Sequence, residues 1–425
     1  MTKVLINEEN FTNIANAIRR KNGETTTYKP SEMATAISNI ESKTAEDLEM
    51  EACFNSIIDD SFGAHVTKLP DNITSIGARA FYKCTNLALT RLPSSITNIG
   101  DEAFSECTNL ALVELPSSLT SVGTEAFENC PNLALTELPN NLTNIGTSAF
   151  LKCTNLALTK LPSGLTIIND RVFIQCTNLA LTELPNGLTS IGAQAFSSCT
   201  NLALTKLPNN VTTIGRYAFA NCINITLTEL PSNITAIESY AFTGCSNLAL
   251  IELPSGITSI GQQAFYQCTN LALTELPNGV TTIGSEAFAN CTNIKLTKLP
   301  DSLTSIGTST FKYCTGVNIT EIPSGVTYID GWSFEGCSKI TELTCLGNIT
   351  DFAYGAFMST SLAKLVLPNI TAVPTLGSSV FSSTPIGSKT GYIYVPDTLV
   401  DSFKSAANWS IYADQIKPIS ELEAN

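Results

Sequence analysis

The sequence contains a single histidine, His65, among its 425 residues. Catalytic triads, histidine-based metal sites and imidazole proton shuttles all require this side chain. The sequence therefore argues against these kinds of site, and we interpret His65 as a solvated residue without a chemical role. Charged residues are also few, at 14%, against roughly 25% in typical soluble domains. The polar surface must consist mainly of Thr, Ser and Asn.

Basic residues are scarce as well, because 23 Lys and Arg stand against 37 Asp and Glu, for a net charge of -14. Such a surface repels nucleic-acid phosphates and anionic lipid headgroups. No apolar run reaches the roughly 18 residues that a membrane span requires, and the N-terminus lacks the apolar core of a secretory signal peptide. We predict no nucleic-acid binding, no membrane insertion, and synthesis in the cytosol without a recognisable signal peptide.

A repeat organises most of the chain. Twelve cysteines recur every 23 residues from Cys84 to Cys337, and the same step separates the prolines from Pro70 to Pro323. The phenylalanines follow it from Phe81 onward. A period of this length, with aliphatic, aromatic and cysteine columns in register, is typical of a solenoid. We predict a right-handed β-solenoid or arc of about fourteen coils.

Each coil is expected to contain a short strand, a turn and a helical arc. The aliphatic segment 87–92 predicts the strand, which Pro93 ends by removing a hydrogen-bond donor. Gly100 is expected to supply a turn conformation that a side chain would hinder. The segment 103–107 predicts a short helical or 3-10 arc with its inner face buried. The glycine column is interrupted at Asn169, Glu238 and Asp330.

Four regions follow from this pattern. Residues 1–42 have two stretches of helical apolar spacing and are predicted to form a helical hairpin that attaches the protein to a larger assembly. Residues 43–65 are a linker and N-terminal cap, 66–385 the solenoid, and 386–425 a C-terminal cap. Trp409 is expected to cover the final coil, because the exposed end of a repeat stack needs a lid.

The cysteines lack the C-x-x-C spacing of zinc or thioredoxin-like sites. We interpret the column as a ladder of buried free thiols that act as small hydrophobic side chains. Cys53 and Cys345 lie outside the column, and the sequence leaves their redox state open. No cofactor and no metal site are predicted.

A charged residue precedes Leu-Pro or Ile-Pro in most coils, and a Thr usually precedes that residue. The charged residues are Arg91, Glu114, Glu137, Lys160, Glu183, Lys206, Glu229, Glu252, Glu275, Lys298 and Glu321. On a solenoid they form a row, which either keeps a solvated sheet soluble or binds an extended ligand. The like-charged run Glu229, Glu252 and Glu275 has the carboxylate spacing of retaining glycosidases. A flat sheet offers no pocket, however, so we predict no enzyme.

Aromatic residues flank the phenylalanine column on the predicted arcs. They are Tyr82, Tyr217, Tyr240, Tyr266, Tyr313 and Trp332. Exposed aromatic rings stack on sugars or anchor protein partners. The alternative interpretation is a scatter of surface aromatics without a binding role.

Two stretches carry a family pattern. VTTIGRYAF at 211–219 is followed by Cys222, and ITSIGQQAF at 257–265 by Cys268. They resemble the BspA-like leucine-rich repeats, and the resemblance covers roughly residues 66–385. It implies a leucine-rich-repeat solenoid and a surface protein that binds host molecules or neighbouring cells.

The strand segments depart from this family. The family places aliphatic residues at the first, fourth and sixth positions, as in Ile340, Leu343 and Cys345. Most units here use the first, third and sixth positions instead, so a bulge in the strand is an alternative to a regular one.

The N-terminal stretches IANAIRRKNG at 14–23 and YKPSEMATAISNI at 28–40 resemble a helical segment of tail and fibre proteins of phages that infect Gram-positive bacteria. The closing stretch YVPDTLVDSFKSAANWSIYADQIKPIS at 394–420 resembles the C-terminal end of many such repeat proteins from gut bacteria and their prophages. The same segments also occur in bacterial surface proteins. We therefore expect a phage or prophage tail-associated recognition protein that contacts a protein or glycan of the host surface. The alternative is a bacterial cell-surface adhesin of the same fold. The ligand, the binding face, the curvature and the oligomeric state stay open.

Overall fold

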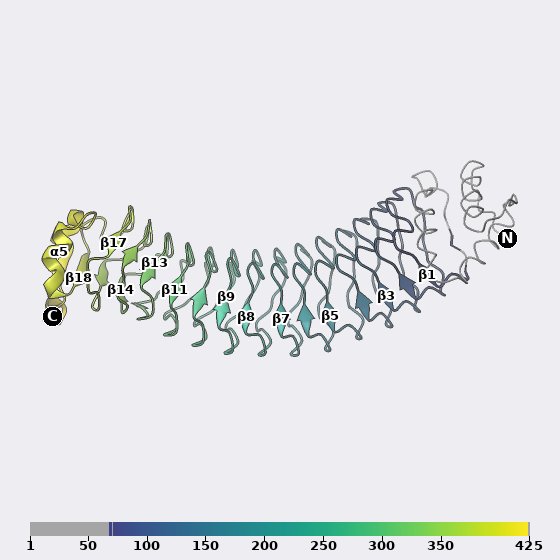
Figure 1. The fold of residues 1–425 in the computed structure, drawn as a ribbon, viewed down its shortest axis with the longest axis horizontal. Helices are drawn as coiled ribbons and strands as arrows, with labels where there is room; N and C mark the ends of the chain where they lie inside the picture. Colours follow the sequence, from purple (N-terminus) through teal and green to yellow (C-terminus); the bar gives the residue numbers. More distant parts are fainter. Residues whose placement is uncertain (1–67, 70, 424–425) are drawn as a thin grey trace, which may run out of the picture. The chain divides into compact units, whose positions relative to one another are not determined.

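The computed structural model describes residues 68–69 and 71–423. The predicted helical module 1–42, the linker and cap 43–65, and with them Cys53 and His65, lie outside these residues. The chain forms two compact units whose boundary in sequence falls between Leu181 and Thr182. Both units are parallel β-solenoids, with about 15 turns of roughly 23 residues in all, and Figure 1 shows the coils following one another along each unit. The predicted fold class is confirmed.

Each described coil of the first unit contributes one two-residue strand. These strands are β1 (Ser75–Ile76), β2 (Asn98–Ile99), β3 (Ser121–Val122), β4 (Asn144–Ile145) and β5 (Ile167–Ile168). Strands β1 to β4 pair in parallel, and Ile76 lies beside Ile99. The second residue of each strand is buried and the first is not. The strands therefore form one wall of the core.

The second unit repeats this wall and adds another sheet towards its C-terminus. The wall contains β6 (Ser190–Ile191), β7 (Thr213–Ile214), β8 (Ala236–Ile237), β9 (Ser259–Ile260), β10 (Thr282–Ile283), β11 (Ser305–Ile306), β13 (Tyr328–Ile329), β15 (Asp351–Phe352) and β17 (Thr375–Leu376). The added sheet contains β12 (Glu321–Ile322), β14 (Glu342–Cys345), β16 (Lys364–Val366), β18 (Tyr392–Val395) and β19 (Ile416–Pro418). All pairings recorded among these strands are parallel.

The strand prediction for the segment 87–92 and its equivalents was wrong for most coils. Its Leu-x-Leu-x-x-Leu spacing breaks the two-residue alternation of a strand. In one such segment the backbone N–H of Ala249 donates to Leu227 of the preceding coil at 3.1 Å, but no strand forms there. The coil with the family spacing does form a four-residue strand at this place, β14. In coils with the departing spacing, the segment therefore lies at the same place as β14 but does not form a regular strand there.

The core is a set of identical residues stacked from coil to coil. In the first unit, the ring of Phe104 lies 5.2 Å from that of Phe81 and 5.3 Å from that of Phe127, with nearly parallel planes. The thiol of Cys107 donates to the backbone carbonyl of Phe81 at 2.9 Å. The second unit repeats this arrangement, and such columns let every coil bury its inner face only against its neighbours.

The predicted helical arc is a pair of tight turns instead. Two residues of each described coil have left-handed backbone, one two positions before the phenylalanine column and one directly before the cysteine column. In one coil these are Gln263 at φ 50° and Gln267 at φ 60°. Their N–H groups donate to the next coil, at Ser285 and Ala289, over 2.9 Å each. A helix needs negative φ at every residue, so the left-handed residues end any helix in this segment. Their N–H groups bond to the next coil instead of within a helical turn.

The glycine column has a different role from the predicted one. Neither Gly215 nor Gly261 has positive φ. A Cβ on Gly261 would lie 2.5 Å from the backbone N of Ser239 in the preceding coil. At Gly261 the absent side chain therefore allows a close approach of two backbones, whereas the coils with Asn169, Glu238 and Asp330 accommodate a Cβ in this column. Asn169 occupies the same column, and its side-chain amide donates to the carbonyl of Ile145 at 2.7 Å.

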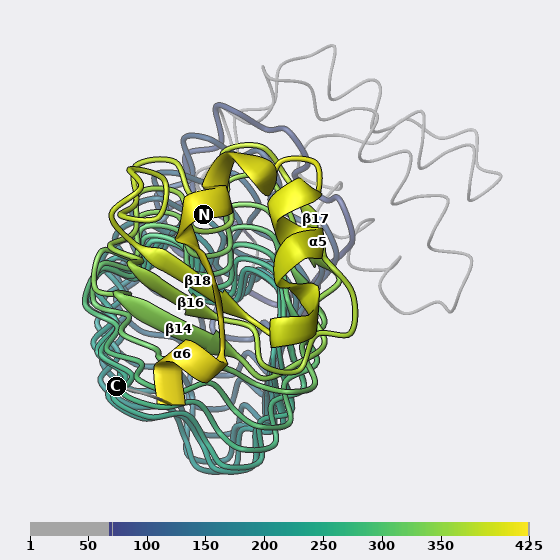
Figure 2. The same cartoon turned by 90° about the vertical axis from the view of Figure 1, so that its left-hand side faces the viewer.

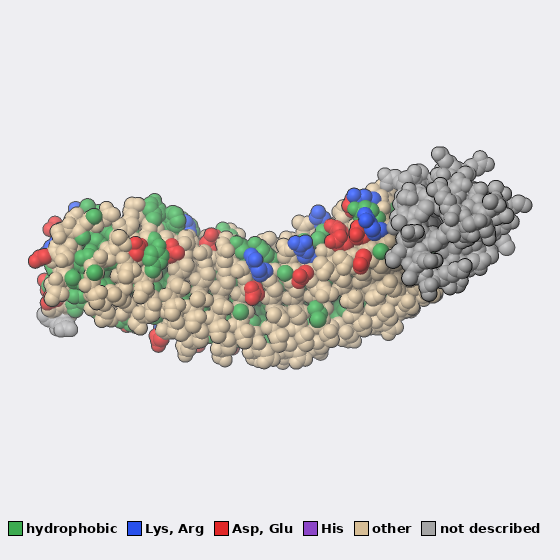
Figure 3. Space-filling model, in the orientation of Figure 1, with side chains coloured by type: hydrophobic (Ala, Val, Ile, Leu, Met, Phe, Trp, Pro, Cys, Tyr) green, Lys and Arg blue, Asp and Glu red, His purple; other side chains and the backbone are tan. Residues whose placement is uncertain are grey.

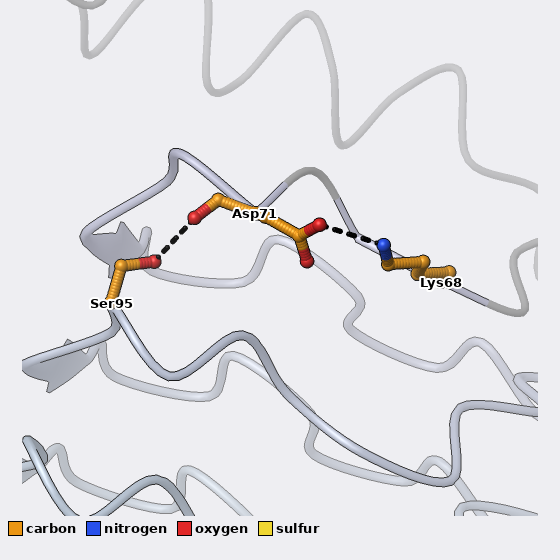
Figure 4. Close-up of polar contacts among 3 residues, drawn as sticks. All are labelled: Lys68, Asp71 and Ser95. Carbon is orange, nitrogen blue, oxygen red and sulfur yellow. Dashed lines mark hydrogen bonds and ion pairs between the residues drawn. The ribbon is translucent and has the colours of Figure 1, made fainter. Parts of the chain in front are cut away.

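The first described coil shows how polar side chains join neighbouring coils. The ammonium of Lys68 contacts the carboxylate of Asp71 at 2.7 Å, and the hydroxyl of Ser95 donates to the backbone carbonyl of Asp71 at 2.9 Å (Figure 4). Ser95 also donates to the carbonyl of Ile73 at 2.6 Å. The single hydroxyl proton of Ser95 is therefore shared between two backbone acceptors of the preceding coil.

The C-terminal segment closes the core of the second unit. Its helices are η1 (Asp397–Leu399), α5 (Val400–Ser405), η2 (Ser410–Gln415) and α6 (Ser420–Glu423). Figure 2 looks onto this end and shows α5 to one side of β14, β16 and β18, which lie next to one another. Trp409 is 1% exposed, packs against Phe403 at 4.8 Å, and donates to the carbonyl of Pro374 at 2.7 Å. Trp409 thus covers the last phenylalanines, as expected.

Candidate ligand-binding surface

The predicted charge ladder is exposed in both units but lies mostly on the extended segments, not on strands. Only Glu321 belongs to a strand, β12. The first unit carries Arg91, Glu114, Glu137 and Lys160, and the second carries Glu183, Lys206, Glu229, Glu252, Glu275, Lys298 and Glu321. The structure therefore presents the ladder to solvent within each unit, although not on the sheet face that the sequence predicted.

The acidic run of the ladder has no enclosed geometry. Glu229, Glu252 and Glu275 are exposed, and the ion pairs recorded among residues 182–423 do not include them. Glycoside hydrolysis needs one carboxyl group whose environment differs from that of its partner. Three equivalent, solvated carboxylates do not provide this difference.

The turns with left-handed residues carry the aromatic side chains, and we call the two left-handed positions of each coil the turn edge. In the second unit, Tyr217 and Tyr240 stack with ring centroids 4.3 Å apart. Desolvation and the neighbouring Tyr217 raise the pKa of Tyr240. Tyr266 lies beside this edge and accepts a hydrogen bond from Gln267 at 3.4 Å. The structure thus pairs Tyr217 with Tyr240 and leaves Tyr266 outside the pair.

A second cluster lies farther along the same unit. Tyr313 donates its hydroxyl to Glu335 at 2.8 Å, which raises the pKa of Tyr313. The ammonium of Lys312 forms an ion pair with the other oxygen of Glu335 at 2.7 Å. The same ammonium lies 5.6 Å from the ring centroid of Trp332, and Tyr354 meets Trp332 edge-on at 5.1 Å. Two predicted aromatics, Tyr313 and Trp332, are therefore joined in one site.

Sequence reasoning missed three members of this cluster: Lys312, Glu335 and Tyr354. Figure 3 shows charged and hydrophobic side chains mainly in the upper part of the displayed face, including the region of β13 and β17. A usable signal was present in the sequence. Gly336 follows Tyr313, and Gly355 follows Trp332, by one period of 23 residues.

The turn edge of the first unit is charged rather than aromatic. Arg79 pairs with Glu102 at 3.5 Å, and its guanidinium lies 4.4 Å from the ring centroid of Tyr82. Beside this edge, partial burial and the nearby carboxylate of Glu125 raise the pKa of Glu128. The same scaffold therefore displays different chemistry in the two units.

The cysteines provide no reactive site among the described residues. All thirteen described cysteines, Cys345 included, are buried, and burial raises the pKa of Cys345 to about 12. The predicted ladder of buried thiols is confirmed. Within residues 71–423 no group of His, Cys, Asp and Glu is arranged to hold a metal ion. No helix of the described part has the length and apolarity to cross a membrane.

Comparison with protein families gives the repeat its identity. The model of the BspA type leucine rich repeat region matches residues 60–180, 166–295 and 258–387. The chain belongs to this family. BspA-type leucine-rich-repeat proteins are typically non-enzymatic binding proteins of cell surfaces, and no catalytic family is indicated. No curated protein matches this BspA-type chain.

One solved structure shows the same fold. A leucine-rich repeat protein from Bacteroides ovatus is 24% identical, with a TM-score of 0.66, and the alignment covers 83% of this chain and 91% of that one. A leucine rich cell surface protein from Faecalibacterium prausnitzii is 26% identical with a TM-score of 0.46, over 76% of this chain and 82% of that one. The first similarity establishes the solenoid fold and nothing further.

Proposed function

We propose that this BspA-type protein is a non-enzymatic recognition protein that binds a macromolecule of a cell surface through the turn edge. One observation carries the proposal. The buried columns repeat nearly the same residue in each coil, whereas the left-handed positions of the turn edge hold Arg, Lys, Glu, Gln, Ser, Asn, Tyr or Trp and, in three cases, Gly. A non-glycine residue there costs roughly 1–2 kcal/mol. Retaining varied side chains against this cost is explained if they contact a ligand.

Two settings are compatible with this role. The family supports a bacterial cell-surface adhesin that binds host or neighbouring-cell molecules. The resemblance of 14–23 and 28–40 to phage tail proteins, and of 394–420 to repeat proteins of gut bacteria and their prophages, supports a tail-associated protein that contacts the bacterial host, attached through residues 1–42. Both settings use the same exposed solenoid surface. Labelling of intact producing cells and of sedimented phage particles with an antibody against the solenoid separates the two.

Binding to cells tests the function itself. We would measure binding of the fluorescently labelled full chain to a panel of intact Gram-positive strains, with unlabelled protein as competitor. Saturable binding that a Tyr217→Ala/Tyr240→Ala variant weakens is the expected result. The matched control reverses the acidic run of the ladder by Glu229→Lys, Glu252→Lys and Glu275→Lys. Loss of binding only in the control would move the site to the ladder, and absence of saturable binding to every strain would refute host contact.

A further inference from the structure

The second aromatic cluster depends on two glycines, one in each of two successive coils, that leave room for its rings. Gly336 and Gly355 occupy left-handed turn-edge positions, at φ 72° and 63°, where most other coils carry a side chain. A Cβ on Gly336 would lie 2.4 Å from Cδ1 of Tyr313, and one on Gly355 would lie 3.0 Å from Cδ1 of Trp332. Each ring therefore lies over the glycine of the following coil, in space that a side chain would otherwise fill.

Polar contacts fix these rings in place. The side chain of Glu335 is only 6% exposed, and its two oxygens meet the hydroxyl of Tyr313 at 2.8 Å and the ammonium of Lys312 at 2.7 Å. Lys312 also lies 5.3 Å from the ring centroid of Tyr313 and 5.6 Å from that of Trp332. The side chains are thus ordered before any ligand arrives, which lowers the entropic cost of binding.

Aromatic surface nevertheless stays open to solvent in this cluster. Tyr313 is 43% exposed and Tyr354 is 45% exposed, while Trp332 is half-buried. Tyrosine and tryptophan combine an apolar ring with a polar tip, and the ammonium of Lys312 and the hydroxyl of Tyr354 place hydrogen-bond donors beside the rings. An amphipathic ligand with an apolar face and a rim of hydroxyl groups matches this combination.

We propose that Tyr313, Trp332 and Tyr354, together with Lys312, form a binding site for an oligosaccharide of equatorially linked pyranoses. The proposal rests on the proposed recognition function and names its ligand class. A pyranose presents C–H groups on its face and hydroxyls at its edge, so it stacks on the rings while its hydroxyls reach Lys312 and Tyr354. A cationic ligand fits less well, because the ammonium of Lys312 already lies over two of the rings.

Intrinsic fluorescence provides a direct assay. The chain has two tryptophans, and Trp409 is 1% exposed in the core, so a ligand at the surface changes the emission of Trp332 alone. We would titrate the full chain with the hexasaccharide of β-1,4-linked N-acetylglucosamine and with cellohexaose. A proline-rich peptide serves as the competing ligand class, because such peptides also dock on aromatic surfaces. A saturable change in emission with at least one hexasaccharide, and none with the peptide, is expected.

Variants locate the site. Titration calorimetry should show affinity reduced about tenfold in Trp332→Ala and in Tyr354→Ala, and largely restored in Trp332→Phe, because an aromatic contact contributes on this scale. The control is Tyr392→Ala, which removes an exposed aromatic of the C-terminal segment with Lys417 at 5.9 Å from its ring and should change affinity less than about twofold. Thermal unfolding of each variant, followed by circular dichroism, checks that the fold is intact.

The outcomes separate this proposal from the proposed function. If the full chain binds cells but neither hexasaccharide, the oligosaccharide site is refuted and the recognition function stands. A Trp332-dependent response to the peptide alone would assign the cluster to protein ligands and also overturns the proposal. Hexasaccharide binding that Trp332→Ala leaves unchanged would place the sugar elsewhere. Trp332-dependent hexasaccharide binding without any cell binding supports the site and counts against the cell-surface role.

Discussion

Two glycines of one coil give opposite predictions for the same substitution. Gly261 and Gly256 lie five positions apart, and neither has positive φ. At Gly261 an added Cβ would meet the backbone of the preceding coil, at 2.5 Å from N and 2.8 Å from Cα of Ser239. At Gly256 the nearest atom is the carbonyl oxygen of Ile234 at 3.7 Å, an ordinary contact. Comparing the two substitutions therefore distinguishes the steric effect of an added Cβ on the preceding coil from the effect of the glycine's greater backbone freedom.

The expected magnitudes follow from these distances. Backbone atoms cannot rotate away as a flexible side chain can, so Gly261→Ala must push two coils apart and lengthen the 2.8 Å bond from its own N–H to Ile237. Overpacking of this kind costs about 1–3 kcal/mol, and the lower entropy of the unfolded Ala chain returns about 0.4–1 kcal/mol. Gly261→Ala should destabilise by about 1–2 kcal/mol, and Gly256→Ala should stabilise by about 0.4–1 kcal/mol.

Urea unfolding followed by far-UV circular dichroism measures both variants. Because unfolding of a repeat array need not be two-state, hydrogen exchange of peptides from β8 and β9 should accompany it. Exchange in these peptides should accelerate in Gly261→Ala and not in Gly256→Ala. Equal stability of the two variants would refute the close-approach explanation of the glycine column. Asn169, Glu238 and Asp330 occupy the same column, so the prediction concerns the coils in which the glycine backbone is in close approach; at Asn169 the amide donates to the preceding coil.

Three further predictions follow from the described residues. The pKa of Cys345 in the folded protein is raised to about 12 from an ordinary 9.0. The unfolded chain therefore loses this proton first, and the free energy of unfolding falls as the pH rises from 9 to 12. Melting temperatures across this range check the prediction, and they should fall less in Cys345→Ala. Gln267→Gly should stabilise the protein by about 1 kcal/mol, because φ of Gln267 is 60°. Gln262 has no positive φ, so Gln262→Gly should destabilise the protein by about 0.5–1 kcal/mol. The urea midpoint should therefore be higher in Gln267→Gly than in Gln262→Gly. Trp409→Ala should cost about 3–5 kcal/mol and increase hydrogen exchange first in β15 and β17; uniform exchange would contradict a capping role.

The sequence was sufficient for the repeat and its core, because burial demands the same residue in every coil. The columns of Phe104 and Cys107 are buried as their periodicity predicts. The positions of the strands were not predictable in this way. Two-residue strands such as β2 (Asn98–Ile99) have no alternation to detect, and the more aliphatic segment 87–92 drew the strand prediction instead. The turns were missed because left-handed backbone at Glu102 or Glu106 has no glycine to reveal it.

The candidate site follows the opposite rule from the scaffold. In a periodic sequence, each buried column is recognised because the same residue recurs in every coil. A binding site forms instead where two neighbouring coils depart from the repeat at positions that contact each other. Tyr313 with Gly336, and Trp332 with Gly355, are such pairs, since each ring fills the space that its glycine vacates. Tyr313 and the two glycines are not informative alone, because the chain has 11 tyrosines and 25 glycines, whereas Trp332 is one of only two tryptophans. Their one-period offset becomes meaningful once cross-coil bonds, such as that from Trp332 to the carbonyl of Tyr354 at 3.0 Å, fix which residues are neighbours.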